Sequence, residues 1–100
     1  MDFEWDEAKR RANILKHGLD FVAAVKIFDG WFIEAVDQRR DYDERRFRAI
    51  GELDDRIIHV AYTWRGERRR IISARRAGRN DRRAYYASLA QGARKDEGSH

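Results

Sequence analysis

The stretch RRRIISARRA, residues 68–77, holds the side chains with the clearest chemical potential in the sequence. Five arginines surround residues 71–74, whose composition is typical of a buried strand. Arginine can form two parallel hydrogen bonds with a phosphate or a carboxylate. The pattern therefore indicates a strand that is buried in its middle and offers anion-binding groups at its ends.

The alternation of side chains along a strand divides these arginines between two faces. An ideal strand places residues 69, 71, 73 and 75 on one face and residues 70, 72, 74 and 76 on the other. Ser73 then lies on the same face as Arg75, whereas Arg68 points to the opposite side. Arg68 and Arg75 can join one site only if the strand twists or bulges.

The charge of the chain is distributed unevenly. The formal net charge is +4, but residues 1–61 carry 11 basic against 14 acidic residues, and residues 62–93 carry nine arginines against two acids. Such clustering costs repulsion that an anionic ligand relieves, which favours a nucleic acid or an acidic partner. A solvated surface is the simpler alternative, and Glu34 and Asp37 could neutralise part of the field by pairing with Arg75 or Arg76.

Candidates for proton transfer are few. His17 follows Lys16 at the predicted end of a helix, and histidine changes charge near neutral pH, as a general acid or base must. The alternative role for His17 is to cap the helix by bonding its last carbonyl groups. His59 is expected to be a sheet-face residue, and Tyr85 is a weaker candidate because packing explains it equally well.

The composition argues against several classes of site. The chain has no cysteine, and its three histidines are far apart in sequence, so we expect neither a disulfide nor a metal site. It has no glycine-rich phosphate loop, and no cofactor is expected. No apolar run is long enough to span a membrane and the N-terminus lacks a signal-peptide pattern, which predicts a cytoplasmic protein without a membrane partner.

Two helices are predicted before the strands. Asp6 is a good N-cap and Gly18 suits a helix C-terminus, so the first helix lies between them. Its predicted apolar stripe is formed by Trp5, Ala8, Ala12 and Leu15. A second helix begins after Asp20 and ends at residues 29–30.

Four strands and a closing helix follow. The strands are predicted at residues 31–37, 47–53, 56–62 and 68–77, the last three as an antiparallel meander. Asn80 can cap a last helix, with Tyr85, Tyr86 and Leu89 facing the sheet. The order ααββββα predicts an α+β fold, a small antiparallel sheet with helices on one face. We expect a single domain over residues 1–92 and a flexible tail over residues 93–100.

Two separated motifs resemble the BrnT family of bacterial toxins. They are FEWDEAKRRANILKHGLDFVAAVKIFD and YTWRGERRRIISARRA, and the resemblance covers about residues 3–86. The matching residues are Phe3, Trp5, Asp6, Asn13, Lys16, His17, Gly18, Ile27, Phe28, Tyr62, Thr63, Arg65, Gly66, Arg68, Arg70, Ile71, Ile72, Ser73, Ala74, Arg75 and Tyr85. Gly78 and Trp64 depart from the family pattern, which often has a threonine and a polar residue at these positions.

The resemblance implies a RelE-like fold and a ribonuclease that blocks translation, in the manner of an mRNA interferase. It also implies a cognate BrnA-type antitoxin, which neutralises the toxin in a complex and binds operator DNA. On this basis the catalytic candidates are His17, Lys16, Arg68, Arg75, Ser73 and Tyr85. The RNA-binding candidates are Arg65, Arg70, Arg76 and Arg79.

The favoured hypothesis is metal-independent endoribonuclease cleavage, in which the ribose 2′-hydroxyl attacks the adjacent phosphorus. Arginines suit the stabilisation of the dianionic phosphorane, and a histidine suits the proton transfers. Two alternatives stay open. A nucleic-acid-binding module would use the arginines without proton transfer, and a protein-interaction module would use them only for an acidic partner.

Overall fold

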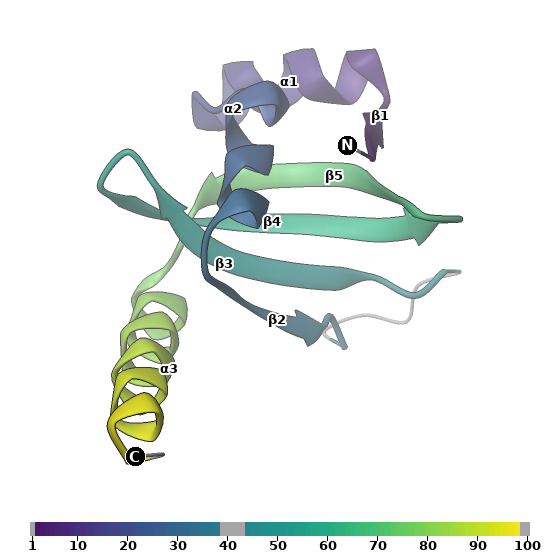
Figure 1. Cartoon of the computed structure of the whole chain (residues 1–100). Helices are drawn as coiled ribbons and strands as arrows, with labels where there is room; N and C mark the ends of the chain where they lie inside the picture. The colour runs from purple at the N-terminus through teal and green to yellow at the C-terminus, as the bar shows by residue number, and fades with distance from the viewer. Residues whose placement is uncertain (1, 39–43, 99–100) are drawn as a thin grey trace.

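The computed structural model describes residues 2–38 and 44–98, with side chains described as far as residue 92. The elements are β1 (Phe3–Trp5), α1 (Glu7–His17), α2 (Phe21–Ala24), the 3-10 helix η1 (Val25–Asp29), β2 (Phe32–Val36), β3 (Phe47–Leu53), β4 (Arg56–Arg65), β5 (Arg68–Arg76) and α3 (Arg79–Gly98). The strands form one sheet in the order β1-β5-β4-β3-β2 (Figure 1). The predicted α+β class is confirmed, with one strand more than predicted.

Helix α1 begins and ends where its capping residues predict. The Asp6 carboxylate accepts hydrogen bonds from the backbone N–H of Ala8 at 2.8 Å and of Lys9 at 3.2 Å. At the other end Gly18 adopts a left-handed conformation, φ 67°, and its N–H donates to the carbonyl of Ile14. Both caps satisfy backbone groups that a helix end leaves unpaired.

The predicted apolar stripe of α1 is wrong. Leu15 is 88 % exposed, and Trp5 lies in β1 instead of the helix. The buried residue of α1 is Asn13, whose amide donates to the carbonyls of Ala74 and Leu19, both at 2.8 Å, and accepts from the N–H of Ala74 at 3.1 Å. β1 pairs with β5 only as far as Ile71, so the outer edge of β5 has no neighbouring strand after that residue. Asn13 provides hydrogen bonds to the backbone N–H and carbonyl of Ala74 at this edge.

The second predicted helix is confirmed from its Asp20 cap but changes to a 3-10 helix at Val25. η1 packs closely on β3, where Gly51 leaves the necessary room. A Cβ atom at Gly51 would lie 2.8 Å from the Cβ of Ile27, which real Cβ atoms do not tolerate. This contact fixes the helical segment against the sheet and completes the core around Phe21, Ile27 and Tyr62.

The meander of β3, β4 and β5 is confirmed. Asp54 and Asp55 both have positive φ, 49° and 65°, and form the tight β3–β4 turn predicted at these residues. β4 continues to Arg65, three residues beyond its predicted end, so the following turn is Gly66 and Glu67.

The additional strand is β1, which pairs in parallel with β5 and makes the sheet mixed instead of wholly antiparallel. Its register places Phe3 beside Arg69 and Trp5 beside Ile71. A strand of three residues is too short for alternation to reveal it in the sequence.

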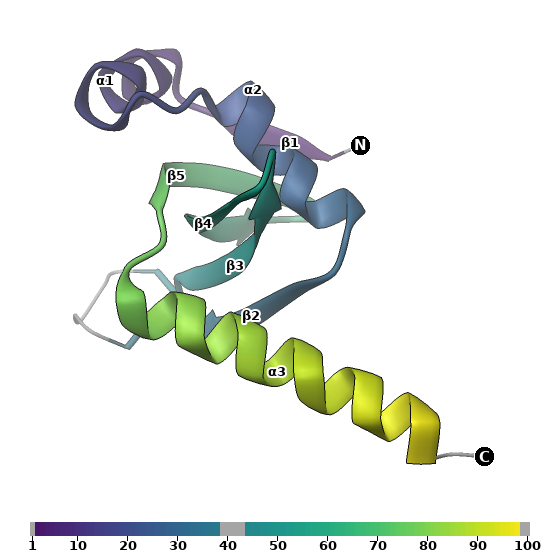
Figure 2. The ribbon, with the colours of Figure 1, turned by 90° about the vertical axis from the view of Figure 1, so that its left-hand side faces the viewer.

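The helices do not all lie on one face. α1, α2 and η1 cover one side of the sheet, as predicted, but α3 lies beside β2 and β3 (Figure 2) and buries Tyr85 against Ile50 and Ile57 on the other side. Tyr86 and Leu89, which were predicted to face the sheet, are 55 % and 40 % exposed. α3 begins at Arg79, so Asn80 is inside the helix and not its cap.

The backbone of α3 is helical as far as Gly98. The flexibility predicted for residues 93–100 stays a prediction, and residues 99–100 lie outside the described residues. Among the described residues, no helix combines the length and apolar character needed to cross a membrane.

Candidate nucleic-acid interface

A bulge in β5 changes which arginines share a face. Tyr62 of β4 pairs with Ile71 and the preceding Ala61 pairs with Ser73, so Ile72 is an extra residue without a partner on β4. Directly paired residues point to the same side of a sheet. The strict alternation predicted for this strand is therefore wrong beyond Ile71. The bulge puts Arg68 and Arg75 on the same side of the sheet, which an unbulged strand would not do.

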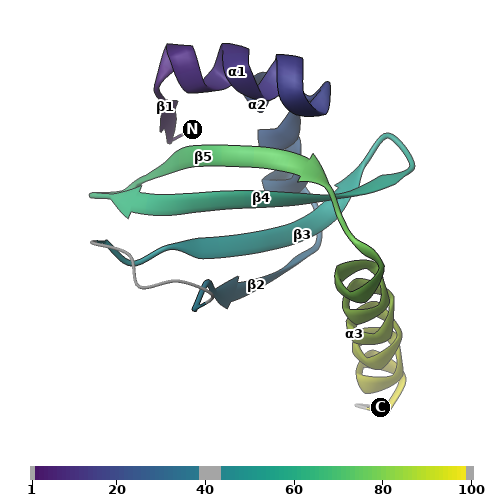
Figure 3. The same ribbon diagram turned by 180° about the vertical axis from the view of Figure 1, so that it is seen from behind.

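The bulge creates a surface that we call the arginine face. Cross-strand pairing places its members on one side of the sheet, with Arg48 beside Ala61 and Ala61 beside Ser73. Figure 3 looks onto this side, where α3 lies at one end and no other described helix covers the strands. The arginine face consists of Arg48 on β3 and Arg68, Arg70, Ser73 and Arg75 on β5.

The two predicted phosphate clamps lie at opposite ends of this face. Arg68 and Arg75 are seven residues apart on one strand, which corresponds to roughly 20 Å at the usual rise per residue. They cannot hold the same phosphate, although they can contact different phosphates of one extended strand.

The Arg75 end of the face is hollowed. A hollow of about 670 Å³ is lined by Arg48, Arg75, Gly78, Arg79, Asn80 and Asp81. Its floor includes the first turn of α3, where backbone N–H groups have no partner within the helix. The acidic residue that lines this hollow, Asp81, accepts a hydrogen bond from Arg48 at 2.8 Å. The charges of the two other lining arginines, Arg75 and Arg79, are therefore not compensated there.

Some of the other arginines have an acidic residue nearby and some do not. Glu4 pairs with Arg70 at 2.7 Å, and Glu44 lies 3.6 Å from Arg65. Glu34 lies 3.7 Å from Arg69 and not beside Arg75 or Arg76, because β2 directs it to the opposite side of the sheet from Arg75. Four of the predicted site arginines have no acid within ion-pair distance in the part of the chain that the structure describes. They are Arg68, Arg75, Arg76 and Arg79.

His17 lies across the sheet from Arg75. It lines a separate pocket of about 280 Å³ together with Arg56 and Arg76, at the junction of the α1 end with the β3–β4 turn. Lys16 is exposed on the same helix end. Of the ten predicted site residues, the structure thus brings His17 and Arg76 together on one side and Ser73, Arg75 and Arg79 on the other.

Tyr85 belongs to neither group. It is 4 % exposed, packs in the small core with Ile50 and Ile57, and contacts the ring of Trp31 with centroids 5.2 Å apart. Burial raises the pKa of its hydroxyl above the usual value. A phenol in this position serves packing more readily than proton transfer.

His59 was predicted as a sheet-face residue and lies in β4 as expected, but its place beside Arg75 was not predicted. It pairs directly with Arg75 and is 1 % exposed, so its ring lies within the surface beneath the arginine face. The sequence alone could not reveal this pairing. Without the bulge, the β4–β5 hairpin would set His59 opposite Ala74 instead of Arg75. Arg48 was also missed, although the tight turn at residues 54–55 fixes its register.

A comparison with protein-family models matches residues 5–81 to the model described as "Ribonuclease toxin, BrnT, of type II toxin-antitoxin system". The chain belongs to the BrnT family. Its members are ribonuclease toxins, and the type II system implies an antitoxin partner for this toxin as well. A comparison with curated proteins found no match.

The matched segment of the toxin includes the whole arginine face and the His17 pocket, whereas Tyr85 lies beyond it. No group of three or more histidine, cysteine, aspartate or glutamate side chains is arranged to hold a metal ion within the described ranges.

Proposed function

We propose that the arginine face binds RNA and that the toxin cleaves the RNA at the hollow beside Arg75. The observation that carries the proposal is the Ile72 bulge, which aligns Arg68, Arg70, Ser73 and Arg75 on a side that only α3 partly covers. A single strand of RNA can run along β5, with its phosphates on the β5 arginines of the arginine face. The reacting phosphate is placed where Arg48, Arg75 and Arg79 meet the first turn of α3.

The proposed reaction is transesterification without a metal. The 2′-hydroxyl oxygen attacks phosphorus and loses its proton, a dianionic phosphorane forms, and the 5′-oxygen leaves with a proton. Arg75 and Arg79 supply positive charge where the phosphorane develops it, and the α3 backbone amides supply hydrogen bonds. Ser73 orients the substrate from the same face.

Proton transfer at this phosphate is assigned to His59. It lies next to Arg75 in register, whereas the predicted acid/base His17 is separated from Arg75 by the sheet. Because His59 is buried beside Arg75, this role requires a local movement of the surface that brings the reacting atoms to its ring. A role for His17 in catalysis requires instead that the reacting phosphate enter the pocket with Arg56 and Arg76.

Two glutamine variants distinguish these sites. His59→Gln is expected to lower single-turnover cleavage by on the order of 10²–10⁴-fold, because glutamine can hydrogen-bond but cannot exchange a proton near neutral pH. His17→Gln is expected to keep cleavage within a few-fold of wild type. Melting temperatures measured on the same preparations separate loss of chemistry from loss of folding. Full cleavage by His59→Gln together with a large loss in His17→Gln would move the reaction to the His17 pocket.

We further propose several features that the resemblance to the family supports. The fold is RelE-like, the RNA is messenger RNA in the cytoplasm, and the antitoxin is of the BrnA type and carries the operator-binding domain. This antitoxin can be recognised as the small protein whose co-expression restores the growth of cells that the toxin arrests.

The purified toxin, freed of its antitoxin, is expected to cleave single-stranded RNA in the presence of excess EDTA. Guanidinium groups, unlike a metal ion, are unaffected by chelation, so the rate should match that in magnesium-containing buffer after correction for ionic strength. Activity that disappears in EDTA and returns with a divalent cation would contradict the metal-independent mechanism. RNA binding without any cleavage would favour a pure binding module.

A further inference from the structure

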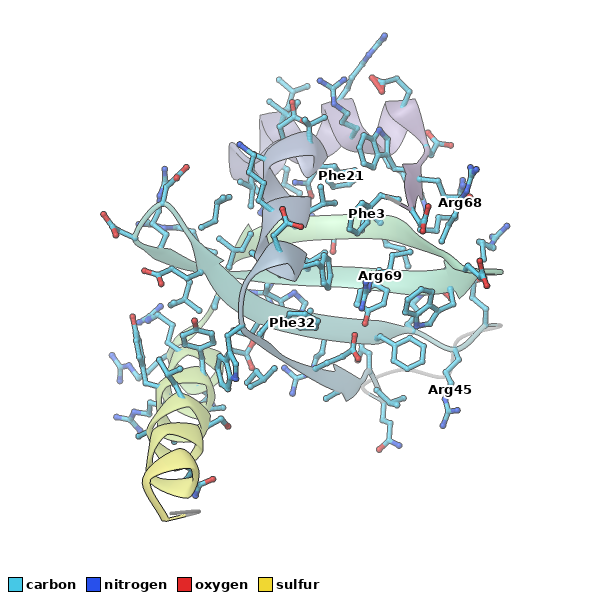
Figure 4. The ribbon with its side chains drawn as sticks, viewed as in Figure 1. Phe3, Phe21, Phe32, Arg45, Arg68 and Arg69 are labelled. Atoms are coloured by element: carbon cyan, nitrogen blue, oxygen red, sulfur yellow. The ribbon has the colours of Figure 1, made fainter. Side chains whose placement is uncertain are left out.

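Arg69 occupies an environment unlike that of the other arginines. It lies on the side of the sheet that faces α2, between the side chains of Phe3 and Phe32 (Figure 4). Its guanidinium carbon is 4.2 Å from the ring centroid of Phe28, 4.6 Å from that of Trp64 and 5.2 Å from that of Tyr62. These distances are within the range of cation–π contacts.

The guanidinium has few polar contacts. Its Nε is buried and has no hydrogen-bond partner among the described residues, and the nearest carboxylate oxygen, on Glu34, is 3.7 Å from the guanidinium, which is longer than a hydrogen bond. The Arg69 side chain is nevertheless 21 % exposed, so its outer edge faces the surface. Burial of this kind is costly unless a hydrogen-bonded anion compensates the charge.

Half-buried rings extend around Arg69. We call the patch the aromatic surface, and it consists of Arg69 with Phe3, Phe28, Phe32, Phe47 and Trp64. The phenylalanines pack against the main core with part of each ring accessible, and Trp64 is 41 % exposed. A cluster of partly buried aromatic side chains around one arginine, with an exposed tryptophan beside it, is typical of the energetic centre of a protein interface.

The charges of this surface do not favour RNA. Glu34, 3.7 Å away, partly offsets the charge of Arg69, whereas the arginine face has guanidinium groups with no acid nearby. The ring of Trp64 already contacts the Arg69 guanidinium and makes a T-shaped contact with Tyr62, which leaves less of it for stacking with a base. A polyanion therefore has a better site on the other side of the sheet.

We propose that the aromatic surface is the docking site of the antitoxin, and that an apolar segment of the antitoxin places one carboxylate against the exposed edge of Arg69. The carboxylate would supply the hydrogen bonds that the guanidinium lacks, and the apolar neighbours would cover Trp64 and the phenylalanine edges. The inference rests on the toxin having an antitoxin, which the family implies, and not on the site of RNA cleavage.

The test measures the affinity of the purified toxin for its growth-restoring antitoxin by calorimetry. Arg69→Met and, separately, Trp64→Ala are each expected to raise Kd by about 30-fold or more, as for a residue at the centre of an interface. Arg68→Met is the matched control, since the neighbouring side chain points to the arginine face, and it should leave Kd within a few-fold. Methionine keeps most of the apolar volume, and the exposed Trp64 provides a second variant that is independent of the buried charge.

RNA affinity of the same variants separates this proposal from the ribonuclease proposal. Arg69→Met and Trp64→Ala should bind a 2′-O-methyl RNA as wild type does. Unchanged antitoxin affinity in both variants would overturn the inference, and so would a loss of RNA affinity in place of antitoxin affinity. A wild-type toxin that binds antitoxin but cleaves no RNA would refute the proposed function and leave the docking result standing.

Discussion

Arg75→Ala is expected to lower the rate of RNA cleavage by on the order of 10²–10³-fold, the usual cost of removing one group that stabilises developing negative charge. Arg75 lines the hollow at the first turn of α3 and has no acid partner among the described residues, so its charge is free for a phosphate. Binding should weaken as well. For a 2′-O-methyl RNA, the slope of log K against log salt should decrease by about 0.7, the contribution of one phosphate contact on a single strand.

Arg76→Ala is the matched control for this prediction. The two residues are adjacent in β5 but point to opposite sides of the sheet, because Arg75 pairs with His59 and Arg76 pairs with Ile58. Both substitutions remove one positive charge, so any effect of net charge alone is the same in the two variants. Equal losses in both would show that the toxin responds to total charge and not to a site. A larger loss in Arg76→Ala would place the reaction in the His17 pocket.

The second large effect concerns stability. Asn13→Ala is expected to lower the free energy of unfolding by about 2–4 kcal/mol, because it leaves the buried N–H and carbonyl of Ala74 without their partner. The Asn13 amide also bonds the carbonyl of Leu19, so the turn after α1 loses its tie to the sheet at the same time. Urea unfolding followed by circular dichroism measures this change.

Leu15→Ala provides the control on the same helix. Leu15 is 88 % exposed, so its replacement should change the free energy of unfolding by less than about 0.5 kcal/mol. A chemist ranking the two positions by hydrophobicity would expect the reverse order. A loss in Asn13→Ala no larger than that in Leu15→Ala would mean that the Asn13 bonds contribute little to the fold.

The sequence predicted most elements because local chemistry determines their ends. Asp6, Gly18 and Asp20 cap helices through bonds within a few residues, and the turn at residues 54–55 fixes the register of β3 on β4. Interactions between distant segments were not predictable in this way. β1 exists only because residues 3–5 pair with β5, more than 60 residues later.

The bulge explains why the candidate site was predicted only in part. Arg68, Ser73 and Arg75 lie on one strand, as predicted, but which side each one faces depends on the extra residue Ile72. Nothing in the aliphatic pair Ile71–Ile72 indicates which residue is unpaired. For the same reason, the sequence did not indicate that His59 lies beside Arg75.

The polar residue of α1 shows a further limit. A periodicity argument assigns buried positions to apolar residues, and it therefore selected Leu15 over Asn13. The helix instead rests on a strand edge whose backbone groups need hydrogen bonds, and an amide with both a donor and an acceptor meets that need.

The claim that RNA lies on the arginine face is tested most directly by nuclear magnetic resonance of the arginine Nε–H groups. The toxin is titrated with a 2′-O-methyl RNA, which cannot be cleaved because the attacking hydroxyl is blocked. The signals of Arg48 and Arg75 are expected to shift with the RNA, while those of Arg56 and Arg76 stay in place. Shifts of Arg56 and Arg76 with unchanged Arg48 and Arg75 would contradict the account and put RNA on the opposite side of the sheet.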